Sequence, residues 1–338
     1  MILSGGRRLV SVVVIGRNEG DRLRRCLESV TRMDRENFDM ELIYVDSGST
    51  DDSLALASRL GARTVALQPT RPCAALGRNA GWHIAKGSLV LFLDGDTVLD
   101  RRFVEESLAD FETAETAVVW GHRREMHPTR SIYNRALDLD WVYAPGRTPF
   151  CGGDALFRTD VLRITGGFDE TLIAGEEPEL CRRITALGFH VLHVDRAMTG
   201  HDLAMTEWSQ YWRRARRAGH AYAEVSERFS TSVDPFWTSE VRHTRNRAIA
   251  LQALAAIGFF GSVIWWVPEP LLFVIAMFVL LAVRSAWKAR WKSKDWYTLL
   301  VYGFHSHLQQ IPIFWGQRKY RSNRRQGKQA MLLEYKKQ

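Results

Sequence analysis

The sequence predicts a mixed α/β fold in which a mostly parallel sheet with flanking helices is followed by a membrane-associated helical region. Short apolar runs alternate with helix-like segments from residue 9 to residue 122, which is typical of a largely parallel sheet. Farther along, residues 248–268 form 21 consecutive positions without a formal charge. At roughly 1.5 Å per residue, this stretch is long enough to cross the ~30 Å hydrocarbon layer of a bilayer.

The elements of the alternating part are expected to follow one another with short connections. Strands are expected at 9–15, 42–45, 63–67, 89–93 and 117–120, and of these 9–15 and 89–93 are expected to be buried. Helices are expected at 21–31, 53–60, 78–85 and 102–112. The glycine-punctuated sequence from about 123 to 204 predicts irregular structure, and a helix is expected after it at 207–228. In such sheets ligands bind beyond the carboxyl ends of the strands, where polar segments follow at 16–19, 46–51 and 94–96.

The C-terminal part predicts a membrane-inserted helical hairpin around Pro268-Glu269-Pro270. A second apolar run at 270–283 follows the uncharged stretch, although it is short for a full span. Lys and Arg lie on both outer flanks, so the positive-inside rule places both ends on the cytoplasmic side. A buried helical hairpin or a hydrophobic dimer interface is the alternative. Residues 296–316, apolar and aromatic with two histidines, are expected in the membrane interface.

The positive charge is confined to the end of the chain. Residues 284–338 hold 13 Lys and Arg against 2 Asp and Glu, whereas residues 1–283 hold 33 against 36. This basic tail beside an apolar segment favours an anionic membrane surface over a nucleic-acid groove, and a solvated tail that adheres to RNA is the alternative. The four cysteines are scattered, which indicates reduced thiols and no zinc or disulfide site. We therefore expect the protein at the cytoplasmic face of the inner membrane.

The first of two acidic clusters is Asp94-Gly95-Asp96, which follows the apolar run 89–93. Two carboxylates at the end of a buried strand suit Mg²⁺ or Mn²⁺. A metal there acts as a Lewis acid on the charge of a leaving diphosphate. His201 is a candidate further ligand, and an imidazole favours Mn²⁺. An ordinary acidic turn and a structural histidine are the alternatives.

The second cluster, Glu176-Glu177-Pro178-Glu179, precedes a helix-like segment at 180–187. Glu177 is the candidate general base, which takes the proton of an acceptor hydroxyl as that oxygen attacks an anomeric carbon. The neighbouring carboxylates would raise the pKa of Glu177, which favours base function. The alternative is a set of acids that complements a helix dipole, and this accounts for Glu179.

Other polar residues are candidates for contacts with a nucleotide or phosphate. Asp46 begins the loop after the second strand, where a carboxylate can bind a nucleobase or a ribose; a turn that caps the next helix is equally open. Asn18 and Glu19 are ambiguous in the same way. Arg78 is a candidate phosphate ligand at a helix start, with a surface arginine as the alternative.

In their order along the chain, these motifs resemble the family 2 glycosyltransferases, which are inverting enzymes with a GT-A fold. The resemblance covers roughly residues 9–225. It is carried by residues 13–19, 44–51, 76–81, 94–96, 152–153 with 157–158, 166–169 and 175–180. By this resemblance Asp46 binds the nucleobase of the donor, Asp94 contacts the donor nucleotide and Asp96 binds the metal. Glu177 stands where the family usually has an aspartate base, so Glu176 or Glu179 remains an alternative base.

The resemblance and the residue chemistry together imply two further groups. The donor nucleotide is expected to contact Asn18, Glu19, Asp46, Ser49, Arg78 and Asp94. The acceptor or phosphate side is expected to comprise Gly152, Gly153, Glu176, Arg213 and Arg214, and the metal ligands are Asp96 and His201.

The expected domains are a catalytic domain at 1–230, a linker and hairpin at 231–295 and an amphipathic segment with a basic tail at 296–338. The catalytic domain divides into a nucleotide-binding half (1–122) and an acceptor-side half (123–230). The resemblance to membrane-associated bacterial members implies transfer of one sugar from a nucleotide sugar to a lipid-linked or growing glycan in cell-surface polysaccharide synthesis, with Mn²⁺ or Mg²⁺. Membrane lipids are expected partners and nucleic acid is not. Transfer to polyprenyl phosphate and a non-catalytic nucleotide-binding scaffold are the alternatives.

Overall fold

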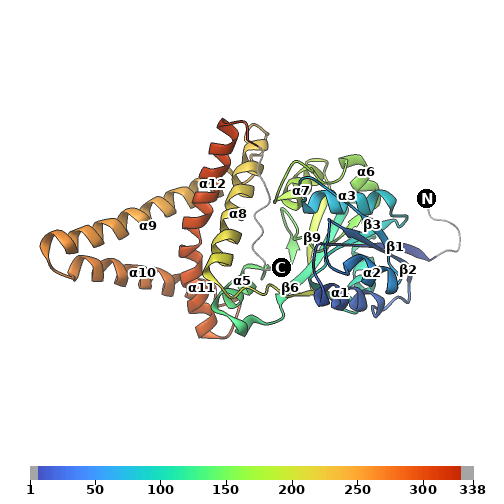
Figure 1. Cartoon of the computed structure of the whole chain (residues 1–338), viewed down its shortest axis with the longest axis horizontal. Coiled ribbons are helices and arrows are strands. Elements are labelled where there is room, and N and C mark those ends of the chain that lie inside the picture. The colour runs from blue at the N-terminus through green and yellow to red at the C-terminus, as the bar shows by residue number, and fades with distance from the viewer. Residues whose placement is uncertain (1–6, 329–338) are drawn as a thin grey trace. The chain divides into compact units, whose positions relative to one another are not determined.

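The computed structural model describes residues 7–328 (Figure 1). Its contacts divide these residues into two units: residues 7–126 with Trp141–Leu203, and His127–Asp140 with residues 204–328. This division falls at residue 203, whereas the expected domain boundary is residue 230. The helix expected at 207–228 is therefore counted with the second unit. The last ten residues of the expected basic tail, 329–338, lie outside the described residues.

The first unit is built on a nine-stranded sheet in the order β3-β2-β1-β4-β8-β6-β9-β5, with β7 beside β9. Its parallel half comprises β1 (Arg8–Gly16), β2 (Phe38–Asp46), β3 (Arg63–Ala66) and β4 (Leu89–Asp94). The other half comprises β5 (Thr97–Leu99), β6 (Thr116–Glu125), β7 (Gly146–Arg147), β8 (Ala155–Arg158) and β9 (His190–His201). Strand β8 runs antiparallel to both β4 and β6, so the sheet is mixed.

Helices cover both faces of this sheet. They are α1 (Asp21–Thr31), α2 (Ser53–Arg59), α3 (Ala74–Ile84), α4 (Phe103–Ser107) with the 3-10 turn Leu108–Phe111, α6 (Thr159–Thr165) and α7 (Glu176–Ala186). Figure 1 shows α3 on one face and α1 and α2 on the other. Because β1 is covered on both faces, its run Val10–Val14 is fully buried, which explains why four of its five residues are valine. The polar residue of the run, Ser11, donates its hydroxyl to the carboxylate of Glu41.

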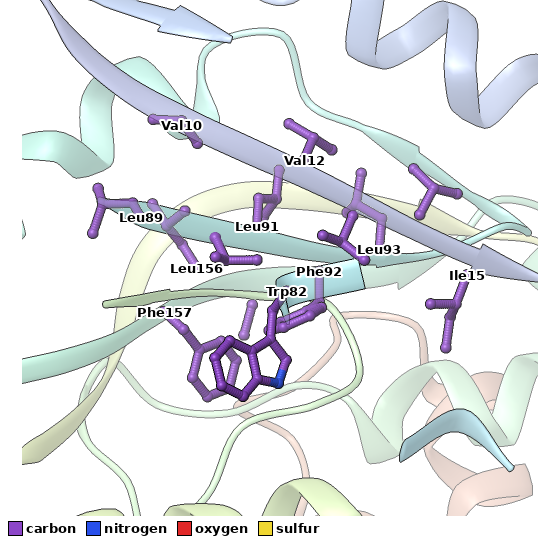
Figure 2. Close-up of a cluster of buried hydrophobic side chains, with 14 of the residues drawn as sticks. Val10, Val12, Ile15, Trp82, Leu89, Leu91, Phe92, Leu93, Leu156 and Phe157 are labelled. Carbon is purple, nitrogen blue, oxygen red and sulfur yellow. The ribbon is translucent and has the colours of Figure 1, made fainter. Parts of the chain in front are cut away.

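The core of the first unit lies between the central strands and their helices. Figure 2 shows side chains of β1 (Val10, Val12 and Ile15), β4 (Leu89, Leu91, Phe92 and Leu93) and β8 (Leu156 and Phe157) together with Trp82 of α3. The rings of Phe92, Phe157 and Phe168 meet edge to face at centroid distances of 5.2–6.0 Å. This core holds the carboxyl ends of β1, β2 and β4 at one edge of the sheet.

The irregular structure expected from 123 to 204 is wrong. This part of the chain contains the twelve-residue strand β9, the strands β7 and β8, and the helices α6, α7 and α5 (Ile132–Asp140). The acids at 176–179 form the first turn of α7 itself, whereas the sequence predicted a helix only from residue 180. Strand β6 also continues five residues past the expected end at Trp120, to Glu125.

The second unit is helical. Besides α5 and the 3-10 turn Pro128–Arg130, it contains α8 (Trp208–Arg228), α9 (Thr238–Trp265), α10 (Glu269–Lys288), α11 (Trp296–Leu308) and α12 (Gln310–Arg325). Helices α9 and α10 are long and apolar enough to cross a membrane, and only 11% of the apolar window of each is buried. At 20 residues, α10 exceeds the expected 14-residue run. By length and composition, both helices are candidate membrane spans.

The segment expected in the membrane interface, 296–316, forms two separate helices that pack on other helices of this unit. A Cβ on Gly303 of α11 would lie 2.1 Å from the carbonyl oxygen of Ala282 in α10. On Gly219 of α8 it would lie 1.9 Å from the carbonyl oxygen of Ile313 in α12. Glycine at these positions lets each helix pair approach closely.

Candidate active site

A buried arginine holds three carboxylates together in the first unit. Arg78, in the first turns of α3, is 2% exposed. Its Nη1 lies 2.8 Å from Glu176 Oε1, and its Nη2 lies 3.1 Å from Asp94 Oδ1 and 3.0 Å from Glu177 Oε1. The expected alternative of a surface arginine is therefore wrong. The cluster brings the end of β4 and the first turn of α7 to the N-terminal part of α3.

The three carboxylates stabilise the charge of Arg78. Burial alone would lower the pKa of Arg78, but the carboxylates of Glu177, Asp94 and Glu176 together raise it above its usual value. The guanidinium consequently stays charged and compensates part of the acidic charge around it. Its face also lies over the ring of Phe168, with 5.5 Å between the guanidinium carbon and the ring centroid.

Glu177 is the carboxylate of its cluster best placed to accept a proton. Burial and, next, the neighbouring carboxylate of Glu176 raise the pKa of Glu177 to about 7, and the charge of Arg78 opposes this rise. The side chain of Glu177 is 16% exposed, against 5% for Glu176. Glu179 is buried and bound by Arg183, whose Nε and Nη2 donate to its two carboxylate oxygens at 2.9 and 2.7 Å. These contacts make Glu179 a structural ion-pair partner.

Asp96 and His201, the two candidate metal ligands, lie side by side. Strand pairing aligns Thr97 of β5 with His201 of β9, so Asp96 comes next to the imidazole. The distance from Asp96 Oδ2 to His201 Nε2 is 3.1 Å, and both side chains are buried. Trp141 packs edge-on against the imidazole, with 5.0 Å between ring centroids.

This pair fits part of a divalent-metal site. A carboxylate oxygen and an imidazole nitrogen suit Mn²⁺, and Mg²⁺ characteristically takes one or two carboxylates plus substrate phosphates. Within residues 7–328, no three His, Cys, Asp or Glu side chains form a potential metal-binding group. The remaining ligands would therefore come from a phosphate-bearing substrate and water, which is the arrangement expected for a metal bound together with a nucleotide diphosphate.

The polar loops after β1 and β2 form one hydrogen-bonded unit. Asp46 is buried at the end of β2, and its Oδ2 accepts the backbone N–H of Gly48 and Ser49 at 3.0 and 2.7 Å. Its Oδ1 accepts the hydroxyls of Tyr44 and Ser49. The carboxylate of Asp46 therefore stabilises the conformation of its own loop, which is one of the two expected roles. The other role, a contact with a nucleobase or a ribose, stays a prediction.

The loop after β1 is tied to the loop after β2. Asn18, with a left-handed φ of 54°, accepts the N–H of Thr50 on its side-chain oxygen at 2.7 Å. Its own N–H donates to the hydroxyl of Ser49 at 2.9 Å. Glu19 pairs with Arg22 at 3.0 Å. The backbone of these loops therefore has a defined shape at the edge of the sheet where ligands bind.

Two residues at the site escaped the sequence reasoning. Arg123 of β6 lies 3.6 Å from Asp94 Oδ2 and 3.7 Å from Asp154 Oδ2, and its guanidinium stacks over Trp141 with 5.0 Å to the ring centroid. Asp154, next to the glycine pair, accepts the backbone N–H of Asp94 at 2.9 Å. Its place directly after Gly152-Gly153 is the signal that could have identified it.

Of the other residues predicted for the acceptor or phosphate side, some lie at the Arg78 cluster and others do not. A Cβ on Gly153 would lie 2.8 Å from Arg78 Nη2 and 2.9 Å from Asp94 Oδ2, so this glycine leaves room for the cluster. A Cβ on Gly152 would meet nothing within 4 Å. Arg213 and Arg214 lie on α8, in the second unit.

Two family models match the chain. The model "Glycosyl transferase family 2" matches residues 11–164, and "Glycosyl transferase family group 2" matches residues 89–306, which is more than half of the chain. The first match spans the β1, β2 and β4 loops, and the second continues through α7 and His201 into the helical unit.

The curated relatives are glycosyltransferases. The glycosyltransferase AglE of Haloferax volcanii is 23% identical over 189 residues, which is 53% of this chain and 62% of AglE. The pre-mycofactocin glycosyltransferase of Mycobacterium tuberculosis is 26% identical over 217 residues, 58% of this chain and 43% of that protein. The O-antigen chain rhamnosyltransferase WbaN of Salmonella anatum is 24% identical over 192 residues, 52% of this chain and 61% of WbaN. The chain thus spans about half of the length of these relatives.

Solved structures with the same fold include the mannosyltransferase PcManGT of Pyrobaculum calidifontis in complex with GDP-Man and Mn²⁺. It superposes with a TM-score of 0.60 at 17% identity, over 94% of this chain and 88% of that chain. S. aureus TarS 1–349 in complex with UDP superposes with a TM-score of 0.50 at 18% identity, over 94% and 92% of the two chains. These likenesses establish the GT-A fold. From the family match and the fold together, the chain belongs to family 2 of the glycosyltransferases.

Proposed function

We propose that the protein is a membrane-associated inverting glycosyltransferase that moves one sugar from a nucleotide sugar to a hydroxyl of a lipid-linked or growing glycan. The observation that carries this proposal is the environment of Glu177. Its pKa of about 7 lets the carboxylate accept a proton near neutral pH, and Asp94 and Arg78 lie directly beside it.

Each step of the proposed sugar transfer is assigned to particular residues. Glu177 takes the proton of the acceptor hydroxyl while that oxygen forms a bond to the anomeric carbon. The bond from this carbon to the diphosphate breaks at the same time, and the nucleoside diphosphate leaves with the electron pair. Attack opposite the leaving group inverts the anomeric configuration. Arg78 orients Glu177 by the ion pair at 3.0 Å.

The donor is assigned to the loops at the carboxyl ends of the strands. Asp46, Ser49, Asn18 and Glu19 would hold the nucleoside through their loops, and Asp94 would contact the nucleotide. Asp96 and His201 would hold Mn²⁺ or Mg²⁺, which neutralises charge on the leaving diphosphate. The mannosyltransferase bound to GDP-Man and Mn²⁺ supports a diphosphate-linked donor with a divalent metal.

The proposed acceptor and the proposed membrane location are supported by the second unit and by the relatives. The O-antigen chain rhamnosyltransferase among them supports a role in cell-surface polysaccharide synthesis. The exposed apolar hairpin of α9 and α10 supports membrane association, with the basic flanks on the cytoplasmic face. We assign Gly152, Gly153, Glu176, Arg213 and Arg214 to the acceptor or phosphate side.

Transfer to polyprenyl phosphate is the second candidate. There the attacking phosphate oxygen is already ionised and needs no base. The ion pair between Glu177 and Arg78 favours it, because a base held by a guanidinium must give up part of that pairing to accept a proton. A nucleotide-binding scaffold without turnover is the third reading.

A donor panel tests these proposals. Nucleotide release is measured from purified full chain with each nucleotide sugar, in Mn²⁺ or in EDTA, with glycan, polyprenyl phosphate or a native lipid extract as acceptor. We expect metal-dependent release from one donor. Glu177→Gln should lower release to a hydroxyl acceptor by ~10²–10⁴-fold, the usual contribution of a general base.

The controls separate the three readings. Glu112→Gln, an exposed carboxyl outside the site, should leave release unchanged. Donor affinity of Glu177→Gln is measured alongside, because a base acts on turnover and not on nucleotide binding. Full activity of Glu177→Gln toward polyprenyl phosphate would establish the second candidate. Nucleotide binding without release from any donor would establish the scaffold.

A further inference from the structure

A strongly basic cavity lies among α8, α9 and α12 in the second unit. Its volume is about 600 Å³. The charged side chains that line it are Arg242, Arg245, Arg321, Arg324, Arg325 and Glu227. Small hydroxyl side chains of Ser226, Ser230 and Thr238 complete its polar wall. The cavity lies outside the candidate active site, and its arginines come from the basic flank of α9 and from the basic tail.

The positive charge in this cavity is largely uncompensated. Glu227 pairs with Arg324, and Arg245 hydrogen-bonds the side chain of its neighbour Asn246. Among residues 7–328, no ion pair involves Arg242, Arg321 or Arg325. Guanidinium groups that share a cavity repel one another, and an anion between them removes that repulsion. The fork of each guanidinium also matches two oxygens of a phosphate.

The position of the cavity along α9 indicates where its anion comes from. Arg242 and Arg245 precede Ala248, the start of the uncharged stretch, by six and three residues. In a helix this is roughly 9 and 4.5 Å along the axis. Beyond Ala248 the helix presents exposed apolar side chains, including Ile257 at 66% and Ile264 at 69%. When that stretch enters hydrocarbon, the arginines lie at the depth of the lipid phosphates.

We propose that this cavity binds the phosphate group of an anionic membrane lipid, either a phospholipid or the polyprenyl phosphate moiety of a lipid-linked acceptor. The inference rests on the proposed membrane association. The arginines line one open cavity beside an apolar hairpin, where a compact headgroup can enter from solvent or from the membrane surface. A nucleic-acid backbone would require an extended basic surface instead. Bound lipid would tie α9 to α8 and α12 at the membrane surface.

Lipid binding is measured on the full chain in mixed micelles of neutral detergent. The probes are phosphatidylglycerol, a polyprenyl phosphate, phosphatidylcholine and inorganic pyrophosphate, and the readout is the saturable shift in unfolding temperature. The site variant is Arg242→Gln with Arg325→Gln. The matched control is Arg247→Gln with Lys319→Gln, which removes the same charge from exposed positions on the same two helices outside the cavity.

We expect half-saturation by phosphatidylglycerol or polyprenyl phosphate to need at least ~10-fold more lipid in the site variant, since charge-assisted bonds to phosphate are lost. The control should change less than ~2-fold. The tighter of these two lipids identifies the source of the phosphate. Equal effects of the two variants would overturn the proposal, as would equally strong binding of phosphatidylcholine or of free pyrophosphate.

Two further measurements distinguish a loss of lipid binding at the cavity from a loss of fold stability and from a failure of membrane association. If the site variant is less stable without lipid, Arg242→Lys with Arg325→Lys replaces it; this variant keeps the charge but loses the fork, and should weaken binding to an intermediate degree. Donor binding and vesicle flotation are measured on the same proteins. If lipid binding is lost while donor binding and vesicle flotation are unchanged, the substitutions affect the cavity alone. If the unmodified chain fails to float with vesicles, the proposed membrane association is wrong.

Discussion

At the scale of single residues, the raised pKa of Glu177 predicts a pH dependence of turnover. A carboxyl group whose pKa is raised to about 7 is protonated at lower pH and cannot act as a base there. Turnover with saturating substrates should therefore rise with pH, reach half of its plateau near pH 7 and level off about one pH unit higher. At pH 6 it should be about tenfold below the plateau. The measurement is the pH profile of kcat for nucleotide release with a hydroxyl acceptor.

Glu176→Gln tests the cause of that pKa. Glu176 raises the pKa of Glu177 by its charge and competes with it for Arg78. Its removal should lower the pKa of Glu177, so the rising limb of the profile should move to lower pH. Glu112→Gln should leave the limb in place. A rising limb that Glu176→Gln leaves where it was would mean that another group controls it.

The sequence could predict which chemical groups stand near the site but not how they pair. Asp94 and Asp96 were identified because they directly follow an apolar strand. For Arg78 the sequence left a phosphate ligand and a surface residue as alternatives. Its partner Glu176 is 98 residues away, so no local pattern shows that contact. Arg123 was missed for the same reason: its partners Asp94 and Asp154 lie on other segments.

At the scale of elements, Gly81 sets the distance between α3 and β1. A Cβ at this position would lie 2.2 Å from Val13 Cγ1, so a methyl group cannot fit without movement. Gly81→Ala should lower the unfolding free energy by about 1–3 kcal/mol, the usual cost of overpacking. The same substitution at Gly152, where a Cβ meets nothing within 4 Å, should cost less than about 0.5 kcal/mol. Urea unfolding in detergent, followed by tryptophan fluorescence, measures both.

The strands that were predicted and those that were missed differ in chemistry. Strands β1 and β4 are apolar because helices cover both of their faces, so their sequences identify them. Strand β9 and the end of β6 carry charged and imidazole side chains, including His201 and Arg123, because these strands also build the site. A polar strand that runs into an active site has no clear periodicity, and the pattern from 123 to 204 was consequently taken as irregular.

At the scale of the whole molecule, the hairpin of α9 and α10 carries the prediction of membrane association. Ile257 and Ile275 lie near the middle of the two apolar stretches and are 66% and 50% exposed. An aspartate at the centre of a membrane helix costs about 2.5–3.5 kcal/mol. Ile257→Asp with Ile275→Asp should therefore weaken partitioning into vesicles by more than ~10²-fold. Flotation of full chain with lipid vesicles in high salt measures this partitioning.

High salt is part of the design because it screens the basic tail and leaves the apolar contribution of the hairpin. Leu187→Asp with Ile164→Asp is the matched control, since Leu187 and Ile164 are similarly exposed apolar residues (56% and 62%) in the first unit. The control should float like the unmodified chain. If the hairpin variant also floats unchanged while nucleotide release persists, the apolar helices serve another purpose, such as the dimer interface that the sequence left open.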